Sequence, residues 1–220
     1  MRILSLGWGV QSFTIVAMVA LGELEPVDYA VHADTGYESS LTYAFAERWT
    51  GWLEERGVKV VTTQLKNKKN IYDLVEIRCL PAYTDTSSRK GGQLRRQCTN
   101  RWKIQPLRKW ISGELARLDL KKIPGVVEMW IGITTDEYHR IRESDVKYIK
   151  NRYPLIDLGM SRDDCKDWLY ENGLEVPPKS GCIICPYRSK KAWRDVYESP
   201  NDWAVAVEID RKIRKVSPPY

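Results

Sequence analysis

Five cysteines provide the clearest signal for chemistry in this sequence. Cys182 and Cys185 form a Cys-x-x-Cys pair, and Pro186 follows it directly. This spacing places two sulfurs where they can hold one metal ion or one edge of a cluster, and the proline stiffens the turn. Cys98 is the candidate third ligand, because it lies at the expected start of a helix, where the helix dipole favours a thiolate.

The sequence leaves the identity of the metal open. Four thiolates, with Cys79 as the fourth, would form a closed structural zinc site. The Cys-x-x-Cys pair also fits a redox dithiol or two ordinary buried cysteines. Cys165 lies in an expected amphipathic helix and is interpreted as a bystander. The odd number of cysteines argues against a secreted disulfide framework and for a reducing compartment.

A glycine-bearing turn near the N-terminus could bind phosphate. Residues 7–12 separate an apolar segment at 2–6 from a second one at 13–21. Small residues between a buried strand and a helix let backbone N–H groups approach a phosphate at the helix N-terminus. The same pattern also fits a tight turn without a ligand.

Two further polar clusters follow expected strands. Asp34, Thr35 and Gly36 come directly after the strand at 27–33, and they are placed to contact a ribose, a base or a cation. The strand at 126–133 runs into a second cluster that begins at Thr134.

The second cluster supplies the candidate catalytic residues. Asp136 could help to hold Mg²⁺, which is bound largely by carboxylates and phosphate oxygens. The guanidinium of Arg140 could stabilise charge that builds on a phosphate.

The order of expected elements predicts an α/β fold. Strands at 2–6, 27–33, 58–62 and 126–133 alternate with helices at 13–21, 40–56 and 100–118, and a polar loop spans 84–97. Helices at 161–172 and 190–215 close the chain. This alternation implies parallel strands, so ligands should bind beyond their carboxyl ends.

Basic residues flank the cysteines on both sides. The candidate substrate-binding residues are Arg95, Arg96, Lys103 and Arg188. Solvated surface charge is the ordinary explanation, but two basic segments around one centre would also attract a sulfate-bearing nucleotide or an RNA backbone.

The composition describes a globular chain with a basic balance. Hydrophobic residues make up 43% of its 220 residues and charged residues 29%, which excludes wholesale disorder and a polytopic membrane protein. Lys and Arg number 35 against 29 Asp and Glu, so the net charge of +6 favours an anionic partner such as a nucleotide or RNA. Nine Trp residues are consistent with stacking on nucleobases, although Trp also packs cores.

We expect one nucleotide-binding domain over residues 1–220, with residues 153–220 as a helical appendage that carries the Cys-x-x-Cys turn. The apolar stretch at 13–21 is shorter than the roughly 20 residues that span a bilayer. The expectation is a cytoplasmic protein with no membrane partner, and the sequence leaves its oligomeric state open.

Four motifs of the sequence match one family pattern. They are Ser-Leu-Gly-Trp-Gly-Val-Gln-Ser at 5–12, Ala-Asp-Thr-Gly-Tyr-Glu at 33–38, Gly-Ile-Thr-Thr-Asp-Glu-Tyr-His-Arg at 132–140 and Ser-Gly-Cys-Ile-Ile-Cys-Pro at 180–186. Together they resemble the phosphoadenosine phosphosulfate (PAPS) reductase-like family of the adenine nucleotide α-hydrolase, or PP-loop, superfamily, in particular its short phage and bacterial members. The resemblance implies a doubly wound, mostly parallel sheet and a phosphate loop for ATP or a related adenine nucleotide. The implied nucleotide contacts are Ser5, Gly7, Gly9, Gln11, Ser12, Asp34, Thr35, Gly36, Gly132 and Thr134.

Two departures from the family pattern bear on the reaction. The PP-loop usually reads Ser-Gly-Gly-x-Asp-Ser, whereas Trp8 stands at the middle glycine and Gln11 at the aspartate. Loss of that carboxylate weakens Mg²⁺ binding unless Asp34 or Asp136 compensates for it. PAPS reductases also carry a catalytic cysteine in a C-terminal Glu-Cys-Gly-Leu-His motif, and no cysteine follows Cys185 here.

The resemblance also suggests a reaction. Cys98, Cys182 and Cys185 resemble the ligand set of the superfamily's tRNA 2-thiolation enzymes, in which three cysteines hold a 4Fe-4S cluster. The sequence therefore predicts an ATP-using, sulfurtransferase-like enzyme that activates an acceptor, with a nucleobase in RNA as the suggested acceptor. One alternative is a sulfonucleotide (PAPS or APS) reductase that uses an external thiol, and another is a nucleotide- or nucleic-acid-binding module without turnover.

Overall fold

The computed structural model describes residues 1–64, 79–83 and 92–214. Within them the chain forms two compact units. The first comprises Met1–Ala33, Leu41–Thr63 and Leu107–Ser180, and the second comprises Asp34–Ser40, Gln64–Pro106 and Gly181–Tyr220. Residues 84–91 of the expected polar loop lie outside the described residues. The single-domain organisation, with 153–220 as an appendage, stays a prediction.

A parallel sheet of five strands forms the centre of the first unit. The strands are β1 (Arg2–Ser5), β2 (Tyr29–Ala33), β3 (Val60–Thr63), β4 (Val127–Trp130) and β5 (Ile149–Arg152). Their order across the sheet is β3-β2-β1-β4-β5. The order reverses between β1 and β4, and the loops after these two strands are where a doubly wound fold binds its ligands.

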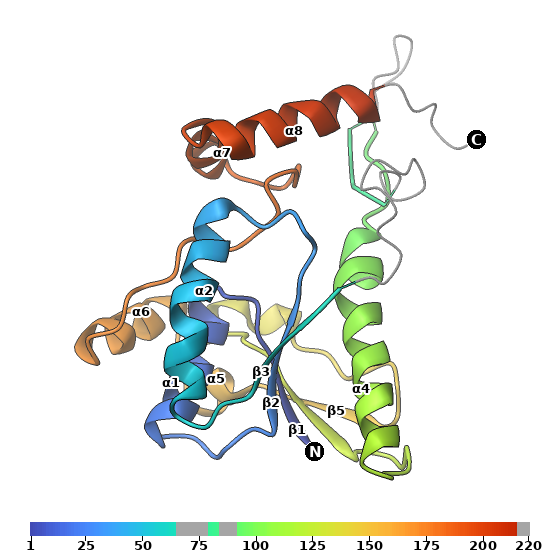
Figure 1. Ribbon diagram of the computed structural model, residues 1–220, viewed down its shortest axis with the longest axis vertical. Helices are drawn as coiled ribbons and strands as arrows, with labels where there is room; N and C mark the ends of the chain where they lie inside the picture. The colour runs from blue at the N-terminus through green and yellow to red at the C-terminus, as the bar shows by residue number, and fades with distance from the viewer. Residues whose placement is uncertain (65–78, 84–91, 215–220) are drawn as a thin grey trace. The chain divides into compact units, whose positions relative to one another are not determined.

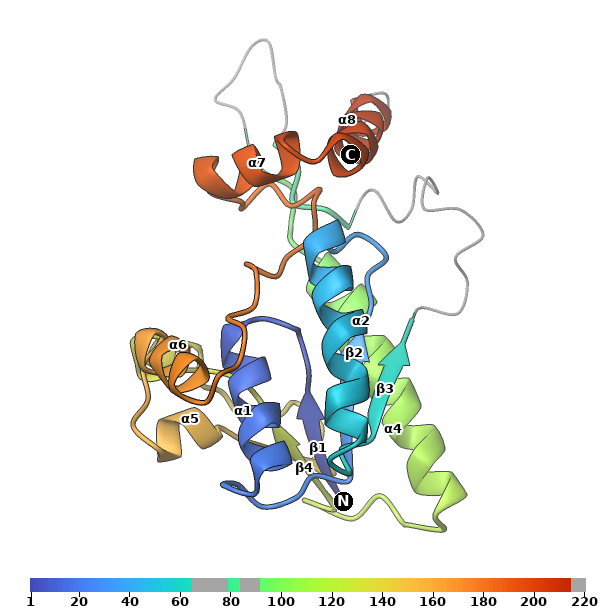
Figure 2. The ribbon, with the colours of Figure 1, turned by 60° about the vertical axis from the view of Figure 1, so that its left-hand side comes forward.

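Helices cover both faces of this sheet, as Figures 1 and 2 show. They are α1 (Val10–Leu21), α2 (Ser40–Glu54), α4 (Gln105–Arg117), α5 (Pro154–Asp157) and α6 (Arg162–Glu171). Helix α4 lies on one face, and the other four lie on the opposite face. None of the helices in the described part of the chain has both the length and the apolar character that crossing a bilayer requires.

Alternation along the strands explains the two layers. Leu4, Ala30 and Trp130 point into the core beneath α1 and α2, whereas their neighbours Ile3 and Val31 pack into the core beneath α4. Successive side chains of a strand point to opposite faces, so a strand that is covered on both sides must be apolar at almost every position. This is why the short run at 2–6 could be predicted as a buried strand.

The helix predicted at 161–172 is confirmed as α6, with Ser161 as its N-cap. The Ser161 hydroxyl accepts the N–H of Asp164, and the Asp164 carboxylate accepts the N–H of Ser161, which completes a capping box. Cys165, one residue further on, has no exposed surface, and burial raises the pKa of its thiol to about 11. Its interpretation as a structural residue fits this environment.

The second unit has its own apolar core. Leu80, Trp102, Ile183 and Ile184 pack in it with residues of α7 (Lys190–Tyr197) and α8 (Pro200–Ile213), and η1 (Thr99–Ile104) precedes α4. The prediction of one helix over 190–215 is wrong, since one helix ends at Tyr197 and a second helix begins at Pro200. Proline has no N–H to donate within a helix and disfavours helical geometry at the residue before it, so Pro200 starts a new helix.

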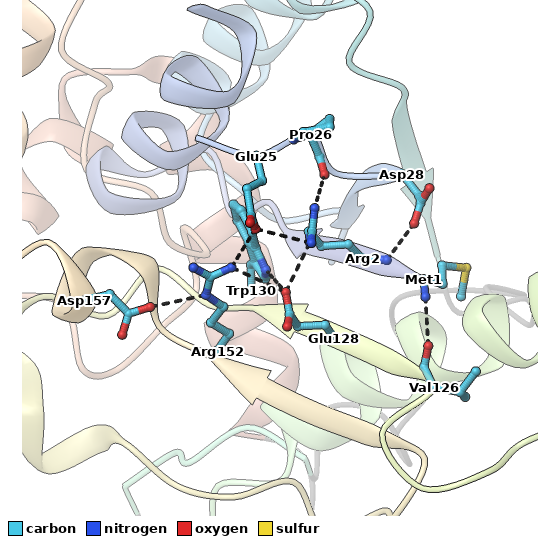
Figure 3. Close-up of polar contacts among 10 residues, drawn as sticks. All are labelled: Met1, Arg2, Glu25, Pro26, Asp28, Val126, Glu128, Trp130, Arg152 and Asp157. Carbon is cyan, nitrogen blue, oxygen red and sulfur yellow. Dashed lines mark hydrogen bonds and ion pairs between the residues drawn. The ribbon is translucent and has the colours of Figure 1, made fainter. Parts of the chain in front are cut away.

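Strand β5 was not expected from the sequence. Ile149–Arg152 reads Ile-Lys-Asn-Arg and contains a single apolar residue. Its pairing with β4 places Arg152 opposite Trp130. Side chains of three strands meet there in a polar network (Figure 3).

Glu128 is at the centre of this network. It accepts hydrogen bonds from the Trp130 indole N–H at 2.7 Å and from Arg2 Nε at 3.2 Å, and Arg152 Nη1 lies 3.6 Å away. Arg152 also pairs with Glu25 at 3.0 Å. Burial opposes ionisation of Glu128, but the indole N–H and the two guanidinium groups outweigh it and hold the pKa of Glu128 below its usual value.

Replacement of Glu128 by Gln should therefore make the protein less sensitive to acid. A carboxyl group whose pKa is lowered by folding stabilises the native state above its unfolded pKa of about 4.5, and this contribution is lost as the pH falls further. At pH 7 we expect Glu128→Gln to cost up to about 1 kcal/mol, because the network is partly exposed. Urea unfolding between pH 7 and 3 measures both effects. If the free energy of unfolding fell by the same amount between pH 7 and 3 in both proteins, the role given to Glu128 would be contradicted.

Candidate nucleotide and thiol sites

The turn between β1 and α1 has the local structure of an anion-binding loop. The Gly7 N–H donates to Ser12 Oγ at 3.1 Å, and the Ser12 hydroxyl donates to the Gly9 carbonyl at 3.2 Å. Gly9 is the N-cap of α1, so no side chain caps the helix, and its first turn carries no acidic residue. The first N–H groups of a helix have no intrahelical acceptor, and together with the helix dipole they favour an anion at this position.

Trp8 gives this loop an unusual anchor. Its φ is 53°, in the left-handed region that glycine tolerates best, and it stands where the family pattern has its middle glycine. The side chain is 2% exposed, and its ring lies 6.5 Å from that of Phe13 and 6.4 Å from that of Phe45. The aromatic packing therefore holds a backbone conformation that a non-glycine residue rarely adopts.

Gly132 brings the loop after β4 against the phosphate loop. A Cβ atom added at Gly132 would lie 2.9 Å from the Ser12 nitrogen and 3.1 Å from the carbonyl carbon of Gln11. Only a residue without a side chain permits this approach. Gly132, Gln11 and Ser12, three of the predicted nucleotide contacts, therefore lie together in the first unit, and their binding of a nucleotide stays a prediction.

Polar side chains after β4 continue this surface. Gln11 Nε2 donates to Glu137 Oε2 at 3.2 Å, and Arg140 Nη1 pairs with the same oxygen at 2.7 Å. Thr134 is fully buried, and its hydroxyl hydrogen-bonds the Asp136 carboxylate, which lowers the pKa of Asp136. The predicted nucleotide contact of Thr134 stays a prediction.

Asp136 has a structural partner. Its Oδ1 accepts the N–H of Arg162, the first residue of α6, at 3.0 Å. This contact links the 3₁₀ segment η2 (Thr135–Arg140) to α6. The predicted role of Asp136 with Mg²⁺ stays a prediction.

In the second unit, Asp34 and Thr35 shape the turn that follows β2. Asp34 Oδ1 accepts the N–H of Gly36 at 2.6 Å, and Gly36 has a φ of 75°. Thr35 Oγ1 accepts the N–H of Tyr37 at 3.3 Å. Asp34 Oδ2 also accepts a hydrogen bond from Gln64. The predicted nucleotide contacts of Asp34, Thr35 and Gly36 are therefore carried by a tightly bonded turn.

A buried carboxylate lies beside the first cysteine of the Cys-x-x-Cys pair. Glu38 Oε1 accepts from Lys103 Nζ at 3.1 Å and from Thr35 Oγ1 at 3.4 Å. Cys182 Sγ lies 3.2 Å from Thr35 Oγ1 and 3.9 Å from Glu38 Oε1. The Glu38 side chain is 1% exposed, and its second oxygen has no partner among the residues that the structure describes.

These contacts set the charge states of the group. Burial and then the Glu38 carboxylate raise the pKa of Cys182 to about 12, against the smaller opposing effects of Lys103 and Thr35. Burial opposes the charge on Lys103, but the Glu38 carboxylate outweighs it and raises the pKa of Lys103. At neutral pH Cys182 is therefore a thiol and Lys103 an ammonium group.

The Cys-x-x-Cys segment is a tight turn, in which the Cys185 N–H donates to the Cys182 carbonyl at 3.1 Å. Arg188 Nε donates to the same carbonyl at 2.8 Å, and its other nitrogens donate to the carbonyls of Gly181 and Ala192. Arg188 therefore braces the turn, rather than presenting a free guanidinium.

The other predicted substrate-binding residues differ in environment. Arg96 lies 5.5 Å from the Tyr187 ring centroid as a cation–π pair, Arg95 is exposed, and Lys103 is held by Glu38. Their binding of a substrate stays a prediction.

The cysteine thiols are possible metal donors, but the described residues do not gather three donor side chains around one point. Cys98 and Cys182 border the same apolar core, and the carbonyl of Cys79 accepts the N–H groups of Gln97 and Cys98. Over residues 1–64, 79–83 and 92–214, no three His, Cys, Asp or Glu side chains are gathered closely enough to hold a metal ion. Cys98 and Cys182 both lie within electrostatic range of Lys103, and the predicted 4Fe-4S or zinc centre stays a prediction.

Two residues of this geometry were not assigned roles from the sequence. Glu38 belongs to the quoted motif at 33–38, and a charged residue beside an apolar strand end was the available signal. Glu137 bridges Gln11 and Arg140, and only the fold reveals this link.

Comparisons with known proteins agree with the fold. No family model and no curated sequence matches the chain. Among solved structures, it is similar to phosphoadenylyl-sulfate (PAPS) reductase from Candida auris, solved as a phosphate complex, with a TM-score of 0.52 and 11% identity over 80% of this chain and 74% of that chain. The U34-tRNA thiolase NcsA from Methanococcus maripaludis, solved with its 4Fe-4S cluster, aligns with a TM-score of 0.46 and 13% identity over 98% of this chain and 72% of that chain. At such identity the likeness to the reductase shows the fold alone, which is the doubly wound, parallel α/β fold that the sequence predicted.

Gly132→Ala should disturb the phosphate loop. The added methyl group would meet the backbone at Gln11 and Ser12, which cannot move as a flexible side chain can, so we expect a loss of about 1 to 3 kcal/mol in the free energy of unfolding. Gly113→Ala is the matched control. Its Cβ would meet nothing within 4 Å in helix α4, and a change between zero and about 1 kcal/mol of stabilisation is expected. Urea unfolding compares the two, and equal effects would refute the close approach.

Cys182 of the metal-free protein should react slowly with iodoacetamide at pH 8, because the thiolate is the nucleophile and the pKa of this thiol is about 12. Glu38→Gln removes a negative charge that raises this pKa, so the variant should react faster. Alkylation of the Cys182 peptide, followed by mass spectrometry across pH, measures both rates. Glu198→Gln, an exposed change on the segment between α7 and α8, should leave the rate unaltered.

Proposed function

We propose that this protein is an adenine-nucleotide-using enzyme of the PP-loop type, which activates an oxygen of an acceptor so that sulfur can replace it. The observation that supports this proposal is the uncapped N-terminus of α1, which follows a loop held by Ser12 and lies against Gly132. Such a cradle suits the phosphates of ATP, and it occupies the position at which doubly wound sheets bind nucleotides.

The residues of the first unit then have distinct roles. Backbone N–H groups at the start of α1 bind phosphate oxygens, and Ser12 keeps the loop in shape. Arg140, which Glu137 holds at 2.7 Å, would stabilise charge on the phosphate that is attacked.

The reaction has two steps. The acceptor oxygen attacks a phosphate of ATP, which forms an oxygen–phosphorus bond and, for adenylation, releases pyrophosphate. A sulfur nucleophile such as sulfide then attacks the activated carbon, so that a carbon–sulfur bond forms, the carbon–oxygen bond breaks and AMP leaves. The cysteines of the second unit are the proposed place at which sulfur is handled.

Nucleotide binding is tested by isothermal titration calorimetry with ATP and with adenosine 3′,5′-bisphosphate. Ser12→Ala removes a hydrogen bond to the Gly7 N–H, so affinity should fall about fivefold or more. Ser112→Ala on helix α4 is the matched control and should bind as the wild type does. Failure of the wild-type protein to bind either ligand would refute the proposed site.

Product analysis separates the possible reactions. Pyrophosphate release that depends on sulfide and an RNA acceptor supports the proposal, whereas sulfite release from PAPS with an external thiol would identify a sulfonucleotide reductase. Cys182→Ser should abolish sulfur incorporation, and Cys165→Ala, a change at a structural cysteine, should retain it. Nucleotide binding without either product would identify a module that lacks turnover. Iron, sulfide and zinc analysis after anaerobic purification tests the predicted centre independently.

A further inference from the structure

A groove runs between α7 and α8 in the second unit. It has a volume of about 590 Å³, within the roughly 300 to 1,000 Å³ typical of ligand sites. Lys190, Trp193, Arg194 and Tyr197 line it from α7, and these positions share one face because they follow the spacing of a helix. Trp203 is the main aromatic residue on the side of α8.

Two aromatic rings of this groove, those of Tyr197 and Trp203, are exposed, whereas Trp193 packs against the core. Tyr197 is 64% exposed and Trp203 is 38% exposed. Their ring centroids lie 5.1 Å apart at an interplanar angle of 78°, so each ring supports the other edge to face. Val196 and Ile209, on the inner sides of the same helices, supply the core packing. The two exposed rings therefore form a platform in which each ring supports the other.

The charges around this platform are unequal. Arg214 Nε pairs with Asp210 at 2.7 Å at one end. Lys190 and Arg194 are exposed at the α7 side, and neither has a carboxylate within ion-pair distance among the described residues. Cations beside aromatic rings complement a ligand that has flat π-faces next to negative charges, which describes a nucleotide strand better than an apolar peptide.

We propose that the groove between α7 and α8 binds a single-stranded nucleic-acid segment, with unpaired bases stacked on the Trp203 and Tyr197 rings, one base to a ring, and its phosphates beside Lys190 and Arg194. The inference extends the proposed function, because it supplies a docking surface for a nucleic-acid acceptor. Binding at this surface needs neither ATP nor the cysteines, so it can be tested separately.

The test uses fluorescence polarisation of a fluorescein-labelled oligouridylate dodecamer with the full chain. Trp203→Ala should raise the Kd by roughly tenfold, in line with the cost of losing one stacked base, and should leave the salt dependence of binding unchanged. Lys190→Ala and Arg194→Ala should each lower the slope of log affinity against log salt by about 0.7, as expected for one lost phosphate contact. The salt slope thus separates stacking from charge.

Matched variants control for fold and for nonspecific charge. Trp203→Phe keeps a stacking ring and should largely retain affinity. Tyr170→Ala removes an aromatic ring that is 82% exposed on α6, and Lys121→Ala removes an exposed charge of the first unit; both should bind as the wild type does. Thermal unfolding monitors each variant, and Tyr197→Ala provides a second loss of stacking if Trp203→Ala unfolds.

Each outcome decides for or against the proposal. Binding to RNA alone, to a DNA strand of the same length alone, or to both supports it and identifies the source of the strand. No binding by the wild type, equal binding to duplex, or full affinity in both aromatic variants would overturn it. Capture of an apolar peptide instead of the oligonucleotide would show that the groove is a protein-docking surface. Ser12→Ala should leave oligonucleotide affinity intact, so failure of this inference and failure of the nucleotide site are distinguishable.

Discussion

The close approach of two backbones is the constraint on which the first unit depends. The sheet reverses its strand order between β1 and β4, and this arrangement brings Gly132 against Gln11 and Ser12 with no room for a side chain. Parallel strands bring their carboxyl ends to one edge of the sheet, so the polar groups that follow β1 and β4 gather at one place. The uncapped start of α1 lies at this place.

The second unit is organised around a different problem, which is a carboxylate in an apolar environment. Glu38 is almost fully buried, and Lys103 neutralises it from a more exposed position. Removal of one partner from such a pair leaves a desolvated charge, so both side chains must be retained together. The pair also determines the surroundings of Cys182, whose thiol stays protonated beside it. Any sulfur chemistry of this cysteine must first supply an acceptor for its proton.

Much of the fold could be predicted because hydrophobic periodicity and capping are local properties. The strand at 2–6, the phosphate turn and the capping box of Ser161 depend on residues that are neighbours in the sequence. Strand β5 could not be predicted, since Ile149–Arg152 is polar and is held by pairing with β4. The break before Pro200 was visible in the sequence but was outweighed by the apolar pattern around it. The link from Gln11 through Glu137 to Arg140 spans more than a hundred residues and needs the folded chain.

Trp8 belongs both to the turn between β1 and α1 and to the hydrophobic core. Its backbone forms part of the phosphate turn, and its indole is wedged among the chain's two phenylalanines, Phe13 and Phe45, beneath α1 and α2. A glycine at this position would let the turn flex independently of the hydrophobic layer, whereas the indole ties them together. Thermodynamic linkage then applies in both directions: an anion captured by the turn reinforces the aromatic wedge, and loosening of the wedge weakens the grip on the anion.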